Sequence, residues 1–129
     1  MTEELNDLVK DEARKLKKNA KKGELRKLSF RKLEPTSAIG CIYGQATGSC
    51  FSTRATELIE AGCKRVYNRA DGLYGVNAAE LNGSPKKADR NNYWSPIEVF
   101  IAKAGNRLNG NNKVLIDFLK GKTKTLKFK

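Results

Sequence analysis

The chain contains no histidine among its 129 residues. This absence excludes Ser-His-Asp and Cys-His catalysis, metal sites with histidine ligands, and proton transfer through an imidazole. Several common routes to chemistry at neutral pH are therefore closed to this protein. We expect a protein that binds a partner and has no enzymatic activity.

Cysteine is scarce, with three residues at Cys41, Cys50 and Cys63. An odd number without a CxxC pair is not typical of a disulfide framework. A zinc site built on these thiols would need a carboxylate or a water as its fourth ligand. Because Cys63 falls on the apolar face of a predicted helix and Cys41 alternates with apolar residues, we interpret both as small buried side chains. We expect no metal and no cofactor.

Long apolar runs are absent too, since no stretch approaches the roughly 20 residues of a membrane-spanning helix. The acidic residues that follow Met1 predict no secretory signal. We therefore expect a cytoplasmic protein that has no membrane partner. With 39% apolar and 31% charged residues the chain is too apolar for full disorder. Its length predicts a single basic domain over residues 1–129.

Acidic residues are outnumbered, with 14 Asp and Glu against 26 Lys and Arg, and the net charge is +12. The excess lies at the two ends. Residues 10–32 carry eleven basic and three acidic residues, and residues 120–129 carry five lysines and no acid. The stretch 33–119 between them is almost neutral. Such ends are typical either of a solvated surface or of a patch that attracts polyanions.

Three regions have the apolar spacing of helices. Residues 3–22 predict a basic N-terminal helix with a narrow apolar stripe, which Gly23 ends. Residues 53–66 predict the clearest helix, because apolar residues fill one complete face of it. A last helix is predicted to begin at Asn111 and to end at Gly121.

The region after Ser95 fits two structures. Ser95 and Glu98 form a capping box, with Pro96 at the first helical position, and this predicts a helix. Apolar residues that alternate over 97–101 are also typical of a strand. We favour the helix and leave the strand open.

Alternating apolar residues predict three strands, at residues 25–33, 38–43 and 122–128. Residues 67–94 are rich in Asn, Gly, Asp and Lys and predict a long polar loop region. Together these elements predict an α+β fold. We expect three to four helices packed on a short, mainly antiparallel sheet.

The main candidate for a small-molecule site is the segment 41–54, Cys-Ile-Tyr-Gly-Gln-Ala-Thr-Gly-Ser-Cys-Phe-Ser-Thr-Arg. The predicted order is a strand, a glycine-rich loop and a helix start, an arrangement whose backbone N–H groups attract phosphate. The segment is neither a Walker A loop nor a GxGxxG fingerprint. The alternative is a tight structural turn whose hydroxyls cap the helix. The candidate anion- or nucleotide-binding residues are Tyr43, Gly44, Gln45, Thr47, Gly48, Ser49, Ser52, Thr53 and Arg54.

A nucleic-acid contact would use the basic ends together with a basic segment at 86–90. Tyr and Trp residues flank that segment, and aromatic side chains among Lys and Arg can stack on bases. Trp94 is expected in the core instead. The candidate nucleic-acid-binding residues are Arg14, Lys17, Lys18, Lys21, Lys22, Lys86, Lys87, Arg90, Lys122 and Lys124.

Three segments resemble small bacteriophage accessory proteins of unassigned function. They are Cys-Ile-Tyr-Gly-Gln-Ala-Thr-Gly-Ser-Cys at 41–50, Ser-x-Arg-Ala at 52–55, and Leu-Lys-Gly-Lys-Thr-Lys-Thr-Leu at 119–126. The resemblance implies a phage protein expressed in the bacterial cytosol. It also implies binding of a host protein, a nucleic acid or a signalling nucleotide, in some cases to blunt host defence.

The leading interpretation is a phage-type binding protein, without enzymatic activity, whose partner is anionic. Nucleic acid would bind to the basic ends, and a nucleotide would bind to the segment 44–54. Two alternatives stay open. One is an inhibitor that binds an acidic patch of a host protein, and the other is an enzyme that processes nucleotides without histidine.

Overall fold

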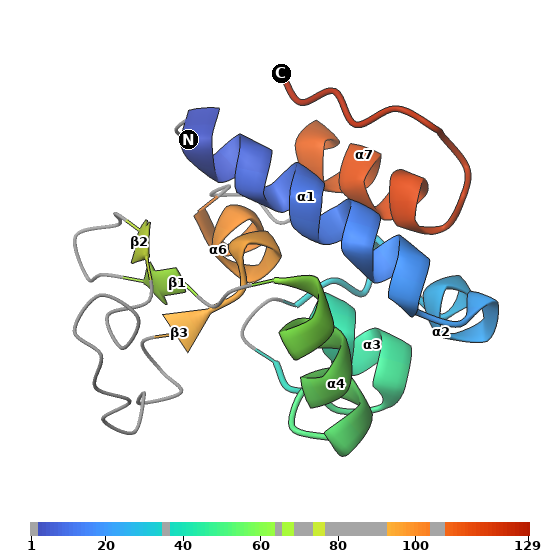
Figure 1. Cartoon of the computed structure of the whole chain (residues 1–129). Coiled ribbons are helices and arrows are strands. Elements are labelled where there is room, and N and C mark those ends of the chain that lie inside the picture. Colours follow the sequence, from blue (N-terminus) through green and yellow to red (C-terminus); the bar gives the residue numbers. More distant parts are fainter. Residues whose placement is uncertain (1–2, 35–36, 64–65, 69–73, 77–92, 104–107) are drawn as a thin grey trace.

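The computed structural model describes the chain over residues 3–34, 37–63, 66–68, 74–76, 93–103 and 108–129. Figure 1 shows its elements in order along the sequence. The helices in this part of the chain are α1 (Glu3–Asn19), α2 (Lys22–Arg26), α3 (Ile42–Thr47), α4 (Thr53–Gly62), α6 (Pro96–Lys103) and α7 (Gly110–Leu119). The strands are β1 (Val66–Asn68), β2 (Tyr74–Val76) and β3 (Tyr93–Trp94).

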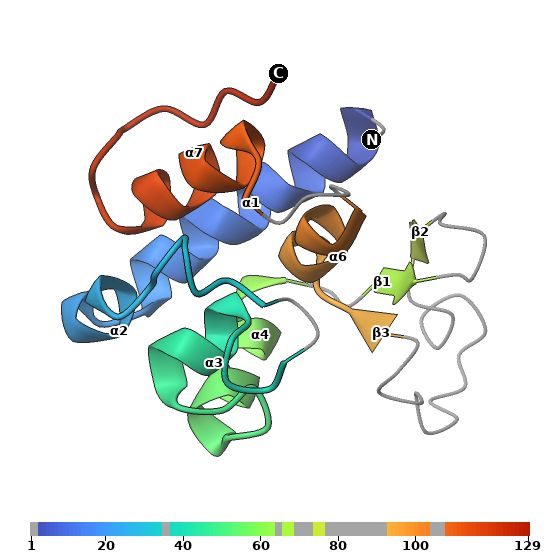
Figure 2. The same ribbon diagram turned by 180° about the vertical axis from the view of Figure 1, so that it is seen from behind.

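Helix α1 lies at the centre of the helical part and packs against α4, α6 and α7 (Figure 1, Figure 2). The predicted apolar stripe on this helix is confirmed, because Leu5, Val9, Ala13 and Leu16 are all buried. Residues three or four apart share one face of a helix, so this stripe can contact several neighbours at once. The basic N-terminal helix is thus also the main packing element of the fold.

The predicted α+β fold is wrong, because helices pack on helices in place of a sheet. The described core consists of side chains from the helices, from the segments that join them and from the C-terminal tail. The strands are only two or three residues long and form a small antiparallel sheet in the order β2-β1-β3. In this sheet Val66 lies opposite both Val76 and Trp94.

None of the three predicted strands forms. Residues 25–33 contain the end of α2 and a turn, and residues 38–43 contain a turn and the first residues of α3. Residues 122–128 have no regular structure. Leu25 and Leu28 lie three residues apart, as in a helix, and both are buried. In so short a segment, helical spacing and strand alternation cannot be told apart.

Helices α4, α6 and α7 begin at side-chain caps that contain a hydroxyl or an amide. The Oγ of Ser52 accepts a hydrogen bond of 3.1 Å from the N–H of Ala55 at the start of α4. The Oγ of Ser95 accepts one of 3.2 Å from the N–H of Glu98, and the predicted helix at this position is confirmed as α6. The strand alternative is therefore wrong. Asn109 caps α7 in the same way.

Two helices end earlier than predicted. Helix α1 ends at Asn19, and Gly23 lies inside α2 instead of ending the first helix. Helix α4 ends at Gly62, and Val66 belongs to β1. The predicted loop region 67–94 contains β2, β3 and most of β1, and its other residues lie outside the described part of the chain.

The C-terminal tail, residues 121–129, turns back at the end of α7 and runs beside that helix (Figure 1, Figure 2). Leu126 is buried, and the centroid of the Phe128 ring lies 4.6 Å from that of Phe100. At the end of the tail, Lys129 exchanges two backbone hydrogen bonds, of 2.9 and 3.1 Å, with the side-chain amide of Asn111. The basic C-terminal segment is therefore held against the helices.

Candidate nucleic-acid interface

A groove opens where the ends of α1, α2 and α7 meet, and we call it the basic groove. Its volume is about 410 Å³. In Figure 1 these three helix ends lie together, next to the point where the tail leaves α7. The groove is lined by Lys17, Ala20, Lys22, Leu25, Arg26, Leu119, Lys120 and Gly121.

Four cations line this groove, and two of them are fixed by contacts of their own. The Nζ of Lys17 lies 4.5 Å from the centroid of the Phe118 ring, within the range of a cation–π interaction. The Nζ of Lys120 donates a hydrogen bond of 2.7 Å to the carbonyl oxygen of Leu28. Lys22 and Arg26 are exposed on α2. None of the described lining residues is acidic.

The groove joins the two basic ends of the sequence. Lys17, Lys22 and Arg26 belong to the basic segment 10–32, and Lys120 begins the basic segment 120–129. Packing of α7 against α1 brings the two segments to one site. The positive potentials of these ammonium and guanidinium groups add up in the groove. An anionic ligand is favoured there because it relieves the repulsion between them.

The tail extends this positive surface beyond the groove. Lys122, Lys124 and Lys127 are exposed along it. Helix α7 has ten residues, so the tail covers a distance of about 15 Å beside it. One strand of a DNA duplex rises by about this length over four nucleotides.

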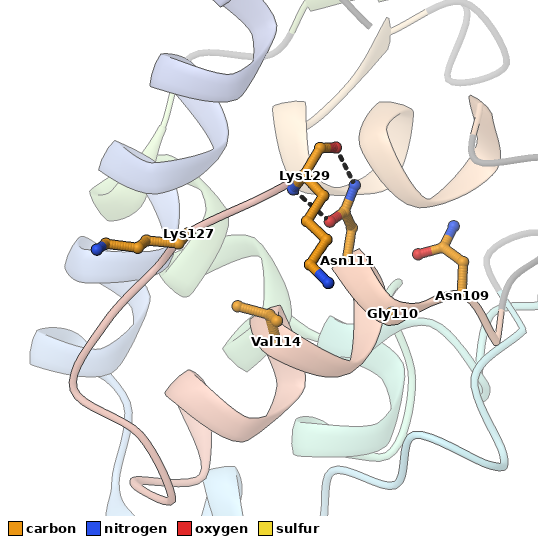
Figure 3. Close-up of a pocket in the computed structure, with 6 residues that line it drawn as sticks. All are labelled: Asn109, Gly110, Asn111, Val114, Lys127 and Lys129. Carbon is orange, nitrogen blue, oxygen red and sulfur yellow. Dashed lines mark hydrogen bonds between the residues drawn. The ribbon is translucent and has the colours of Figure 1, made fainter.

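A second hollow, of about 350 Å³, lies at the other end of α7. It is lined by Asn109, Gly110, Asn111, Val114, Lys127 and Lys129. Figure 3 shows Lys129 extending beside Asn111 and Val114, whereas Lys127 points away from the hollow. The main role of Asn111 here is to hold the backbone of Lys129.

The predicted nucleic-acid-binding residues are distributed over this surface. Lys17 and Lys22 line the basic groove. Arg14, Lys18 and Lys21 are exposed nearby in sequence on α1 and on the turn after it. The tail carries Lys122 and Lys124, and three further candidates, Lys86, Lys87 and Arg90, lie outside the described residues.

Two groove cations, Arg26 and Lys120, were not among the predicted contact residues. Both lie in the basic segments that the composition identified. The packing of α2 and α7 places these two residues, and not other cations of the same segments, at the groove. No local pattern around either residue indicates that contact.

The candidate nucleotide-binding segment does not have the expected order of strand, glycine-rich loop and helix. Residues 42–47 are helix α3, and the Sγ of Cys41 caps it by accepting a hydrogen bond of 3.3 Å from the N–H of Gly44. Gly48, with a φ of 97°, ends this helix in the left-handed region. A residue with a Cβ atom, such as Val, would be strained at position 48 whether or not the segment binds a ligand.

The hydroxyl groups of this segment bind one another and the backbone. The Oγ1 of Thr47 donates a hydrogen bond of 2.7 Å to the carbonyl oxygen of Tyr43. The hydroxyl of Ser52 donates one of 3.0 Å to Thr47 and caps α4, as described above. The Oγ of Ser49 accepts one from the N–H of Phe51, and Thr53 is exposed as the first residue of α4. This arrangement is what the structural-turn alternative expects.

Gln45 and Gly44 serve the packing of α3. The side chain of Gln45 accepts a hydrogen bond of 2.6 Å from the N–H of Ser29 and donates to the carbonyl oxygens of Ser29 and Gly40. A Cβ atom on Gly44 would lie 2.1 Å from the carbonyl oxygen of Ala38. The space beside Gly44, which a phosphate would need in a nucleotide site, is therefore occupied by the backbone of the protein itself.

Arg54 is engaged by an acidic partner. Its Nε and one Nη donate hydrogen bonds of 2.8 and 2.9 Å to the two carboxylate oxygens of Glu24, and an Nη donates to the carbonyl oxygen of Asn19. The hydrogen bonds from Arg54 hold the pKa of Glu24 down at about 2. The guanidinium therefore joins α4 to α2 and has its charge neutralised there.

A buried polar cluster surrounds Glu12 on α1. Glu12 is fully buried, and its carboxylate accepts hydrogen bonds from the hydroxyl of Tyr43 and from the N–H of Ile97. Burial raises the pKa of Glu12 to about 7 and that of Tyr43 well above its usual range. Ser95, also buried, contributes a further side-chain hydrogen bond. Sequence reasoning missed this cluster, because a single Glu among many charged helix residues carries no local sign of burial.

All three cysteines are free thiols, of which Cys41 is buried and Cys50 and Cys63 are half-buried. Burial is the main cause that raises the pKa of Cys41 to about 12, so this group remains a thiol at neutral pH. Within the described part of the chain, no cluster of three or more cysteine or carboxylate side chains could hold a metal ion. None of the helices described there has both the length and the apolar character needed to span a membrane.

Comparison of the chain with protein-family models, with curated proteins and with solved structures gave no match.

Proposed function

We propose that the protein binds the phosphate backbone of nucleic acid through the basic groove and the adjoining tail, without enzymatic activity. One observation carries this proposal. Cations from both basic ends of the sequence line one groove, and no described residue of that lining is acidic. A solvated surface gains nothing from such convergence, because like charges at one site destabilise the fold.

Nucleic acid suits this surface better than a free nucleotide does. The groove and the lysines of the tail form an extended positive path, which matches a repeating phosphate backbone. The segment 44–54, the earlier candidate for a nucleotide, uses its hydroxyls and Arg54 in contacts with the protein itself. Contacts to phosphate carry little sequence information, so we expect binding that depends weakly on base sequence.

A salt titration of fluorescent oligonucleotides tests the proposal. Each phosphate contact releases counterions, and log K should fall with log salt at about −0.7 per contact for a single strand. For about six contacts, four in the groove and two on the tail, affinity should drop by roughly 300-fold between 50 and 200 mM salt. Exchange of Lys22 and Arg26 for Gln should lower the slope by about 1.4, because two contacts are lost.

The matched control removes the same net charge elsewhere. Lys15 pairs with Asp11 and Lys113 pairs with Asp117, each at 2.9 Å. Lys15 also lies about 200° around α1 from Lys17. The Lys15→Gln/Lys113→Gln variant should keep the wild-type slope. Equal losses in the two double variants would mean that net charge, and not the groove, attracts the nucleic acid.

The alternative functions predict different results in these binding experiments. If no oligonucleotide binds at 50 mM salt, the proposal is wrong. An inhibitor of a host protein would then be favoured if a stoichiometric partner were captured with wild type and lost with the groove variant. The resemblance to phage accessory proteins adds a proposed setting, the bacterial cytosol, and a proposed role against host defence.

A further inference from the structure

We infer that the basic groove receives a base and its sugar from a single strand, while the cations around it hold the flanking phosphates. The protein should therefore prefer single-stranded nucleic acid to duplex. This inference rests on the proposed nucleic-acid binding. It adds the form of nucleic acid that the site selects.

The floor of the groove is apolar. It is formed by Ala20, which is half-buried, and by Leu25 and Leu119, whose exposed fractions are 7% and 1%. A site that binds phosphate alone has no use for such a floor, because phosphate oxygens lose their hydration there without gaining hydrogen bonds. A base presents an apolar face that can displace water from the apolar surface left accessible here, which belongs to Ala20 and to the aliphatic stems of the lining cations.

The cations come from different elements around this floor. Lys17 is on α1, Lys22 and Arg26 are on α2, and Lys120 follows α7. Each ammonium has three N–H donors, so Lys120 can donate to Leu28 and still reach a phosphate. A base on the floor would have phosphates on both of its sides, within reach of separate cations.

A duplex cannot use the floor in this way. Its bases are stacked and paired, and each would have to leave the helix at a cost in free energy before it entered the groove. A single strand exposes its bases already, and the usual sites for such strands combine a basic groove with side chains that contact the base faces. Electrostatics alone favours the duplex, which has the higher charge density. A preference for the single strand would therefore indicate that bases contact the apolar floor of the groove.

The test compares three probes of about 16 nucleotides, the upper end of a single-domain site. They are a DNA single strand, the same strand annealed to its complement, and an abasic deoxyribose-phosphate strand of equal length. Wild type should bind the single strand about tenfold more tightly than the abasic strand, which has the same charge but no bases. It should also bind the single strand more tightly than the duplex.

A variant that fills the groove without changing its charge adds a second readout. Ala20→Gln places a neutral side chain over the floor and should remove most of the difference between the single and the abasic strand. The salt slope should stay the same, because the cations are kept. Ala61→Gln is the matched control, since Ala61 is exposed on α4 and lies outside the groove lining. It should behave as wild type.

The outcomes separate this inference from the proposed function. Equal affinity for the single and the abasic strand, or tighter binding of the duplex, overturns the inference and leaves nucleic-acid binding intact. Retention of the base preference in folded Ala20→Gln overturns it as well. If none of the three probes binds, the proposed function fails first. Because the probe comparison uses wild type, it decides the question even if Ala20→Gln does not fold.

Discussion

The Oε1 of Glu12 accepts a hydrogen bond of 2.7 Å from the backbone N–H of Ile97 and so ties the middle of α1 to the first turn of α6. The other carboxylate oxygen accepts from the hydroxyl of Tyr43, which belongs to α3. One buried carboxyl group thus connects three helices. Burial, with Glu98 nearby, raises the pKa of Glu12 to about 7 from its ordinary value of 4.5.

The stability of the protein should therefore fall as pH rises from 4.5 to 7. The folded state holds the proton of Glu12 more tightly than the unfolded state does, so its loss favours unfolding. The contribution of this group is fully present below pH 4.5 and is lost through pH 7, at a cost on the order of 3 kcal/mol. Glu12→Gln should flatten the profile of stability against pH, because Gln does not titrate. The amide oxygen of Gln keeps the acceptor for the N–H of Ile97, so the variant should still fold. Urea unfolding at several pH values measures this, and identical profiles for both proteins would contradict it.

A second group should act in the opposite direction at acid pH. Arg54 holds the pKa of Glu24 down at about 2, so the unfolded state binds its proton more readily. The stability that Glu24 contributes is present above pH 4.5 and is lost as pH falls toward 2. Glu24→Gln should remove the loss of stability between pH 4.5 and 2 and should lower the melting temperature at pH 6. Glu57→Gln is the control, because Glu57 is exposed and lies 3.9 Å from Arg54.

Gly44→Ala should destabilise the protein more than most single substitutions. The added Cβ would lie 2.1 Å from the backbone oxygen of Ala38, and backbone cannot move aside as a flexible side chain can. We expect a loss of about 2–4 kcal/mol in the free energy of unfolding. Gly23→Ala is the matched control. It lies inside α2 with no atom within 4 Å of the added Cβ and should stabilise the protein by about 0.5–1 kcal/mol.

Elements with long periodic patterns were predicted correctly from the sequence. The stripe on α1, from Leu5 to Leu16, spans several turns, so its period could be recognised. The start of α6 was recognised from Ser95 and Pro96, which favour a helix through capping and a fixed backbone angle. These signals are local, and tertiary contacts did not override them.

Short helices and tertiary roles could not be predicted in this way. Helices α2 and α3 have five and six residues, too few to show a helical period. Gly44 suggested a loop, but its function is close packing against Ala38, which only the fold determines. The charges of Lys17 and Lys120 were evident in the sequence. Their meeting at one groove, across about 100 residues, required the packing of α7 on α1.

The last prediction asks whether the two basic ends act on one strand. Lys122→Gln/Lys124→Gln removes two exposed cations of the tail, as Lys22→Gln/Arg26→Gln removes two from α2. If both sets contact the same strand, each variant should lower the salt slope by about 1.4, and the fourfold variant should lower it by about 2.8. Independent phosphate contacts at separate sites contribute additively. A tail variant with the wild-type slope would confine the interface to the groove, whereas a fourfold variant whose slope falls by only about 1.4 would place the two ends on separate strands, each of which loses two contacts.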